Sequence, residues 1–272
     1  MDCMGLSMAA SGGHEYVLRA LVCLVLTQAR IVAMCALIPP LGRNVLPGRL
    51  RVTLTAVLGA FVVPLMMVQA PEKFNMALLM VILLKEVFIG LCLGYALAVP
   101  FWIFESIGTF IDNQRGAGIA SIFNPELGSE TTPLGTFLGR AYAVLFFTTG
   151  GWTLFLAVLY DSYLLWNPWH WYPALRLDAL PLWLGQVDTL LRLMVLYSGP
   201  AIIVMLLAEA GLGLASRFTP QLQVFFLAMP IKSALGILML ALYLHVLADH
   251  AIGLSSRVGE VLPLLRPYWG AP

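Results

Sequence analysis

The fold class is decided by residues 76–104, which read MALLMVILLKEVFIGLCLGYALAVPFWIF. A helix needs about 20 apolar residues to cross a bilayer, and this stretch is longer than that. It shows no alternation of apolar and polar positions, so it does not fit the strands of a transmembrane barrel. Similar apolar stretches occupy residues 16–38, 50–68, 137–165, 187–207 and 222–248. The sequence therefore predicts an all-α, membrane-associated bundle of six long apolar helices.

The composition of the 272-residue chain also indicates a membrane protein, because 60% of its residues are hydrophobic and 11% are charged. Soluble domains carry roughly 25% charged residues, and so few charges could not cover the surface of a soluble enzyme of this size. The formal net charge is +1, so the chain has no large excess of positive charge that could neutralise phosphate groups. This excludes nucleic acid as a partner. The four cysteines have no CxxC spacing, so neither a disulfide framework nor a zinc site is indicated.

The sequence also argues against catalysis, since it contains no HExxH, Walker A, GxSxG or dinucleotide-binding pattern. A metal cluster of His245, Asp249 and His250 can be drawn, but its spacing matches no strong ligand template. We therefore expect no catalytic residue, no cofactor and no metal site, and we expect that the protein is not an enzyme.

Two adjacent charges, Lys85 and Glu86, lie inside the stretch 76–104. Each costs about 2.5 to 3.5 kcal/mol at the centre of a membrane helix. Adjacent helical positions point about 100° apart, so at least one of the two should find its partner on another helix or another chain. Glu86 also begins a stripe with Gly90, Gly94 and Ala98, whose small residues permit close approach of a second backbone. Packing within the chain and contact with another subunit both remain open for this stripe.

Prolines interrupt the apolar stretches at Pro64, Pro100, Pro200 and Pro230. Each removes a helical hydrogen bond and predicts a kink or a break, which a membrane tolerates only where the backbone is buried in protein or lines a water-filled cavity. The pattern E-x-x-x-G-L occurs twice, at residues 86–91 and 209–214, and hints at two related halves.

Two further segments permit two interpretations each. Residues 166–172 (WNPWHWY) suit an aromatic anchor at the membrane interface, or an aromatic cluster packed under a loop. Residues 101–118 form an amphipathic stretch in which Glu105 and Asp112 share one helical face. With the Gly-, Pro-, Ser- and Thr-containing residues that follow to about 135, this stretch is either a mobile gate loop or an interfacial helix with a solvated connection.

Two long motifs carry a family resemblance: residues 85–118, and residues 207–232, which read LAEAGLGLASRFTPQLQVFFLAMPIK. They resemble the T subunit of the type III secretion export apparatus, which has a flagellar counterpart in the same family. Gln223 departs from the asparagine expected in many relatives. The resemblance implies a noncatalytic protein of the bacterial inner membrane that joins R and S subunits in a helical export-gate complex. This complex would admit unfolded secreted proteins, with the U-type switch subunit as a further neighbour, and part of the helices would be lifted toward the periplasm.

The resemblance also implies a domain division and site residues. The division is an N-terminal segment 1–15, one helical domain 16–248 with an R-like part 16–165 and an S-like part 187–248, and a C-terminal tail 249–272. The residues expected to form a gate or plug are Ile111, Asp112, Asn113, Gln114, Arg115, Gly116 and Gly118. Those expected to form buried charges and subunit contacts are Lys85, Glu86, Gly90, Gly94, Glu209, Arg217, Gln221 and Lys232. The alternative is a secondary transporter of a small solute, since broken helices and an inner glutamate are also transporter traits.

Overall fold

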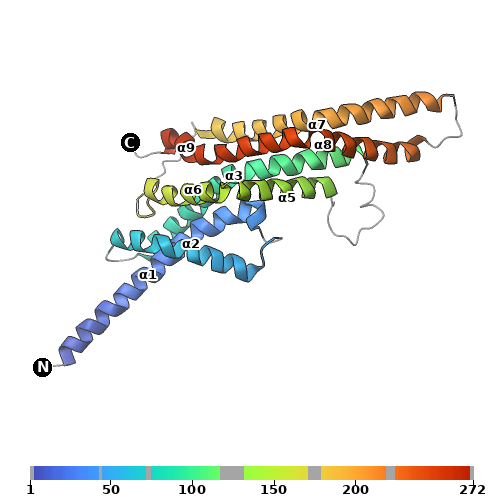
Figure 1. Ribbon diagram of the computed structural model, residues 1–272. Helices are drawn as coiled ribbons and strands as arrows, with labels where there is room; N and C mark the ends of the chain where they lie inside the picture. Colours follow the sequence, from blue (N-terminus) through green and yellow to red (C-terminus); the bar gives the residue numbers. More distant parts are fainter. Residues whose placement is uncertain are drawn as a thin grey trace. The chain divides into compact units, whose positions relative to one another are not determined.

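The computed structural model describes residues 3–42, 45–71, 75–116, 132–170, 179–218 and 224–269, with side chains from residue 16 onward except those of 224–226. All regular elements in these ranges are helices (Figure 1). The longer ones are α1 (Cys3–Leu37), α2 (Gly48–Val68), α3 (Met76–Gln114), α5 (Pro133–Thr148), α6 (Gly151–Leu165), α7 (Leu180–Ser216) and α8 (Val224–Arg257). The shorter ones are η1 (Pro39–Leu41), η4 (Val258–Glu260) and α9 (Val261–Trp269). The predicted all-α class is confirmed.

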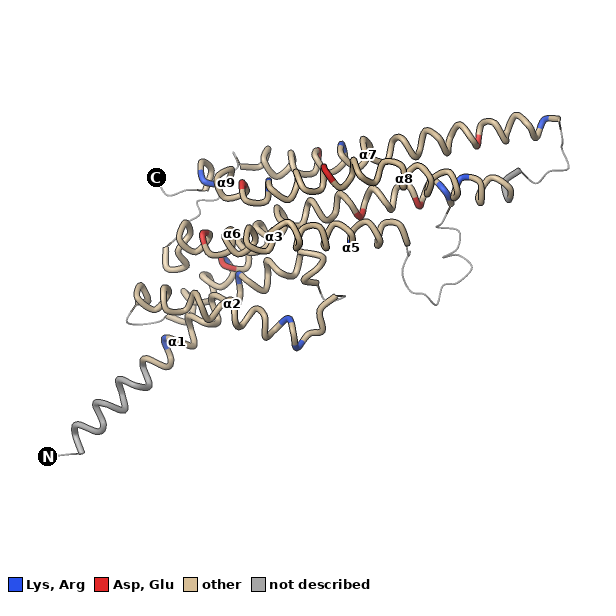
Figure 2. The backbone as a smooth tube through the Cα atoms, in the orientation of Figure 1, with Lys and Arg blue, Asp and Glu red and all other residues tan. Residues whose placement is uncertain are grey.

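Five of the described helices are long and apolar enough to cross a membrane, which confirms the predicted membrane protein. Charged residues are sparse along them (Figure 2). The predicted stretch 137–165 is divided between α5 and α6, and these two helices reach the length of a sixth span only when counted together. The break falls at Gly150, whose φ of 86° is a left-handed conformation that glycine adopts without steric penalty.

The four prolines of the apolar stretches lie inside continuous helices: Pro64 in α2, Pro100 in α3, Pro200 in α7 and Pro230 in α8. The sequence predicts a kink or a break at each proline. None of the four ends its helix, so the break does not occur. An interior proline costs about 3 kcal/mol. Ending a helix in apolar surroundings would leave several backbone groups without partners at several kcal/mol each, so continuation is favoured.

The chain divides into two compact units. Unit 1 comprises residues 1–98, 153–180 and 258–272, and unit 2 comprises residues 99–152 and 181–257. α3 and α6 each contribute to both units, because the divisions fall after Ala98 and after Trp152. The R-like and S-like parts inferred from the family resemblance stay a prediction.

In unit 1, α1 packs along α2 and also receives the N-terminal part of α3. A Cβ atom on Gly90 would lie 2.4 Å from the carbonyl oxygen of Arg30, and one on Gly94 would lie 2.6 Å from that of Met34. The two backbones are therefore in direct contact. α9 also belongs to unit 1, and it buries Val261, Leu262, Leu265 and Trp269.

In unit 2, the C-terminal part of α3 packs on α5 through aromatic rings. Tyr142 stacks on Phe104 with ring centroids 4.7 Å apart, and it meets Phe101 edge-on at 4.8 Å. The Tyr142 hydroxyl lies 3.3 Å from that of Ser255, which connects α5 to α8. α7 is different: of its 37 residues, the buried ones are Ser198, Ala201 and Met205. Most residues of this apolar helix are therefore not buried by the part of the chain that the structure describes.

Candidate functional site

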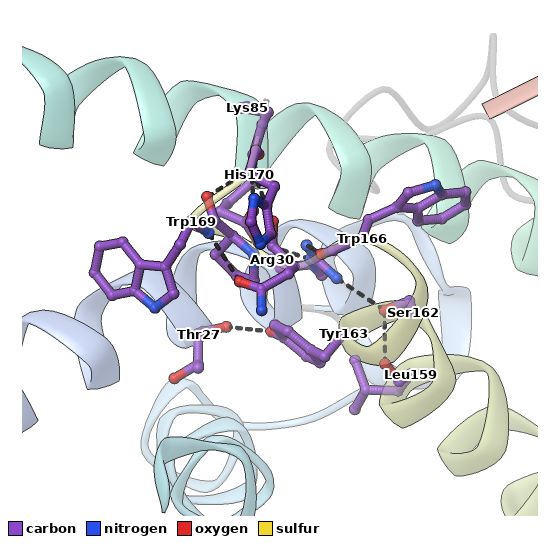
Figure 3. Close-up of polar contacts among 12 residues, drawn as sticks. Thr27, Arg30, Lys85, Leu159, Ser162, Tyr163, Trp166, Trp169 and His170 are labelled. Atoms are coloured by element: carbon purple, nitrogen blue, oxygen red, sulfur yellow. Dashed lines mark hydrogen bonds and ion pairs between the residues drawn. The ribbon is translucent and has the colours of Figure 1, made fainter. Parts of the chain in front are cut away.

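A buried charge pair joins α1 to α3 in unit 1 (Figure 3). Arg30 donates from Nε to Glu86 Oε2 at 2.7 Å, and both side chains are 0% exposed. The remaining guanidinium nitrogens of Arg30 donate to Ser162 Oγ at 3.1 Å and to the carbonyl oxygen of Trp166 at 2.8 Å. The guanidinium carbon also lies 4.1 Å from the ring centroid of Tyr163. The arginine thus has partners on α3, on α6 and on the residue that follows α6, and it neutralises the buried glutamate.

Lys85 ties the same part of α3 to the residues that follow α6 (Figure 3). Its Nζ donates to the carbonyl oxygens of Pro168 at 2.7 Å and His170 at 2.8 Å, with Asn167 at 3.4 Å. Carbonyl groups beyond the last turn of a helix have no helical donor, and an ammonium group satisfies them well. Lys85 also lies 3.4 Å from Glu86 Oε1, so the adjacent charges do contact each other. The short contact of Glu86, however, is with Arg30.

Sequence reasoning missed Arg30. The available signal was its position inside the apolar stretch 16–38, where a cation needs a partner of opposite sign as much as Glu86 does. Which cation pairs with which anion depends on how α1 and α3 are rotated against each other. That rotation follows from the packing of Gly90 and Gly94 on α1, which the sequence alone did not reveal.

The aromatic segment after α6 is packed into the protein. Trp166 is 0% exposed and donates from Nε1 to the carbonyl oxygen of Trp269 at 2.8 Å. Trp169 is half-buried and donates to the carbonyl oxygen of Met66 at 3.1 Å. For Trp166 the interpretation as an interfacial anchor is wrong, and the alternative of a packed cluster holds. Trp171 and Tyr172 lie outside the described residues.

The C-terminal end of α3 holds most of the residues expected to form a gate. Ile111 and Asp112 are fully buried, Asn113 is exposed, and Gln114 and Arg115 are half-buried. Gly116 ends the helix with a φ of 82° and donates its N–H to the Asn113 carbonyl at 3.2 Å, as in a helix C-cap. Gly118 lies outside the described residues. Glu105 is exposed whereas Asp112 is buried, so the two carboxylates of the expected common face have different surroundings.

Asp112 connects this end of α3 to the start of α5. Its Oδ2 accepts a hydrogen bond from the backbone N–H of Leu134 at 2.8 Å, and its Oδ1 lies 2.6 Å from Arg115 Nη2. Beside it, the hydroxyls of Thr109 and Thr132 lie 3.0 Å apart. Residues on both sides of segment 117–131 are therefore bonded to each other.

A second interhelical charge pair lies in unit 2. Lys232 of α8 donates to Glu209 Oε2 of α7 at 2.9 Å. The glutamate side chain is 50% exposed and the lysine side chain 11%. Arg217 is exposed and has no acidic partner among the residues that the structure describes, and Gln221 lies outside them. Within the described ranges, no group of three or more His, Cys, Asp or Glu side chains could hold a metal ion.

The sequence model of a family described as "Bacterial export proteins, family 1" matches residues 21–258. The chain belongs to this family. It is 35% identical over 254 residues to "Yop proteins translocation protein T" of Yersinia pestis, covering 93% of this chain and 97% of the relative. "Surface presentation of antigens protein SpaR" of Salmonella typhimurium is 32% identical over 84% of the chain and 86% of the relative. "Flagellar biosynthetic protein FliR" of Caulobacter vibrioides is 29% identical over 82% and 88%.

These findings confirm the resemblance to the T-subunit family and its flagellar counterpart. The chain is an export protein of the membrane, related to components of type III secretion and flagellar apparatus, and not an enzyme. The buried pair of Arg30 and Glu86 is thus a feature of an export protein. The same holds for the contacts of Asp112 with Leu134 and Arg115, which we call the anchor at Asp112.

Proposed function

We propose that this chain is the T-type subunit of a type III secretion export gate in the bacterial inner membrane. Together with R and S subunits it forms the portal through which unfolded secreted proteins enter the export channel, and the U-type switch subunit is a neighbour. The similarity to the Yersinia translocation protein T over nearly the full length of both chains supports the assignment. It also favours export over the transport of a small solute.

The main support for the proposal is the exposed apolar surface of α7. The helix is 37 residues long, which corresponds to about 55 Å at 1.5 Å per residue. The hydrocarbon core of a bilayer is about 30 Å thick, and even a tilt of about 40° would leave α7 spanning about 42 Å. The acyl chains alone therefore cannot cover the whole helix.

Apolar side chains are nevertheless exposed at both ends of α7. Leu180 is 54% exposed and Leu214 is 62% exposed, and the helical rise places them about 51 Å apart along the axis. At least one end must be covered by something apolar other than acyl chains, since large exposed apolar patches mark interaction sites. R and S subunits would supply that cover, and a helix lifted partly toward the periplasm in the complex fits its excess length.

The proposed gate comprises the end of α3 and the residues that follow it, from Ile111 to about Thr132. Its described residues support this role through the anchor at Asp112, which holds both sides of segment 117–131 at one place. Gly116 adds a backbone conformation that other residues adopt only with strain. In this proposal Asn113, Gln114 and Arg115 supply polar contacts that hold the conduit shut.

The subunit role is tested with the full chain, tagged and co-expressed with its R and S partners, by purification in mild detergent and mass spectrometry. Leu214→Arg should reduce the recovered R and S subunits by about tenfold or more, because it would bury an unpaired charge at the interface. Val45→Arg is the matched control, since Val45 is 58% exposed and lies outside the helices. Undiminished recovery with Leu214→Arg, or a stable solitary chain that binds a small solute, would reject the proposal.

A further inference from the structure

A polar cleft of about 480 Å³ lies on α3 in unit 2. Among the described residues, α7 contributes Met194 to its lining, and α3 contributes the rest. The α3 residues are Trp102, Glu105, Ser106, Thr109, Phe110 and Asn113. Their spacings of three and four place them on one helical face, along a strip about 16 Å long. We call this strip and the space above it the α3 cleft.

The α3 cleft is the face of this segment that the described chain leaves unpacked. Glu105, Phe110 and Asn113 are exposed and the other three α3 residues are half-buried, whereas Ile107 and Ile111 on another face are fully buried. α5 approaches the strip at one end, where a Cβ atom on its Gly139 would lie 3.5 Å from the Cβ of Glu105. The remaining length of the strip is therefore open to a further partner.

Glu105 gives the α3 cleft its charge. The carboxylates of α3 are those of Glu86, Glu105 and Asp112. Glu86 has Arg30 at 2.7 Å and Asp112 has Arg115 at 2.6 Å, whereas Glu105 forms no ion pair with any described residue. A charge on a helix that is apolar enough to cross a membrane is costly without a counter-charge. Because the other residues that line the cleft are neutral, the complementary surface is cationic.

The shape of the α3 cleft favours a helix over a small solute. Sites for small molecules enclose about 70 to 90% of the surface of their ligand. A strip on one helix with a single residue from α7 offers no such enclosure, but it matches three turns of a helix laid along it. The small side chain of Ser106 permits close approach, and the rings of Trp102 and Phe110 supply apolar contact area.

We propose that the α3 cleft receives a helix of an R or S subunit that carries a lysine or arginine, and that this cation pairs with Glu105. The inference rests on the proposed subunit role and adds a second contact surface to the exposed face of α7. Thr109 and Asn113 offer hydrogen bonds to polar groups of the same helix. Glu105 thus acts between subunits, as Glu86 acts within the chain.

The charge is tested in the full chain, tagged, co-expressed with its R and S partners and purified in mild detergent. Glu105→Lys should reduce the recovered R and S subunits by about tenfold or more, because it sets two cations against each other. Glu105→Gln should cause a smaller loss. Glu260→Lys is the matched control, since Glu260 is exposed, does not line the cleft and has no ion pair with any described residue. Undiminished recovery with Glu105→Lys overturns the proposal.

A defect in the chain itself is recognised by its unfolding temperature. Glu105 is exposed and unpaired within the described chain, so Glu105→Lys should leave the unfolding temperature of the detergent-purified chain unchanged. A fall that accompanies the loss of R and S would show that Glu105 acts within the chain, which also overturns the proposal.

The partner helix is identified with the photo-reactive residue benzoylphenylalanine in place of Asn113, in the same co-expressed complex. The cross-linked peptide should come from R or S and should carry a lysine or arginine. Changing that cation to glutamate should reduce recovery on its own, and combining it with Glu105→Lys should restore recovery. Cross-links only to secreted polypeptide, lipid or a second copy of this chain overturn the proposal, as does a charge exchange that restores nothing.

The failure of this inference differs from the failure of the subunit role. If Leu214→Arg abolishes recovery of R and S while Glu105→Lys leaves it intact, the subunit role stands and the α3 cleft is not a contact surface. If the unmodified chain recovers neither R nor S, the subunit role itself is refuted, and the inference with it.

Discussion

The pattern E-x-x-x-G-L occurs once in each unit, and the structure treats its two copies differently. In unit 1, Glu86 is fully buried against Arg30 at 2.7 Å, and a Cβ atom on Gly90 would lie 2.4 Å from a backbone oxygen of α1. In unit 2, Glu209 is half exposed beside Lys232 at 2.9 Å, and no other described part of the chain comes within 4 Å of the place where a Cβ on Gly213 would be. We call the first copy the packed copy, because α1 covers it. We call the second the open copy, because its glutamate is half exposed and no described segment covers its glycine.

The difference separates two uses of one motif. A glutamate followed by a glycine one turn later offers a charge and a flat surface to an incoming helix. In unit 1, α1 takes that place, so the motif stabilises the chain itself. In unit 2, Lys232 of α8 contacts the carboxylate, but among the described residues no helix covers the glycine. The open copy thus fits the proposed subunit contact better than the packed one.

The largest effect is expected at the buried pair. Glu86→Gln alone leaves the Arg30 guanidinium buried without its counter-charge, and Arg30→Met alone does the same to Glu86. Removing one partner of a buried pair costs about 3 to 5 kcal/mol. We expect either variant to lower strongly the unfolding temperature of the detergent-purified chain. The double variant should recover part of the loss, because it removes both charges together.

The control for this prediction is Glu209→Gln, which removes the corresponding carboxylate of the open copy. Glu209 is half exposed, so water screens its charge, although its loss also leaves the mostly buried Lys232 without a counter-charge. The unfolding temperature of Glu209→Gln should therefore fall by less than that of Glu86→Gln. Equal losses in Glu86→Gln and Glu209→Gln would show that the two copies do not differ in the way described.

Sequence reasoning predicted the helical class because long apolar stretches dominate every other signal. It also predicted that Glu86 needs a partner, since the transfer cost of a charge is independent of the fold. It could not name Arg30, because the rotation of one helix against another is set by side-chain packing. The four prolines predict a kink or a break, and all four lie inside continuous helices. The break falls instead at Gly150, between the apolar residues of α5 and α6, where the sequence pattern predicts one continuous apolar stretch.

The anchor at Asp112 shows a second reason for the limits of sequence. The family resemblance places Asp112 in the gate, but the partner that connects it to α5 is the backbone N–H of Leu134. Any residue except proline could supply that donor, so no side-chain pattern marks it. Thr132, the N-cap residue of α5, makes no side-chain capping bond, and its contact with Thr109 becomes visible only once the end of α3 and the start of α5 are placed together.

A smaller effect, of opposite sign in the two copies, is expected from alanine at the glycines. Alanine is favoured over glycine within a helix by about 0.8 to 1 kcal/mol. At Gly213 this gain meets no obstacle, so Gly213→Ala should raise the unfolding temperature slightly. At Gly90 the added methyl group collides with the backbone of Arg30, and overpacking costs about 1 to 3 kcal/mol. Gly90→Ala should therefore lower it. A rise in both variants would mean that α1 and α3 can separate at little cost.

The smallest effect on the chain itself is expected from exchanging the open charge pair. The double variant Glu209→Lys with Lys232→Glu restores the attraction between α7 and α8, so the unfolding temperature should change by the equivalent of less than about 1 kcal/mol. It nevertheless presents the opposite charge on the exposed face of α7. If Glu209 also contacts a partner subunit, recovery of R and S in the purification should fall while stability is kept. If the exchange leaves that recovery intact, the pair serves only the contact between α7 and α8, and the charge of the open copy plays no part in assembly.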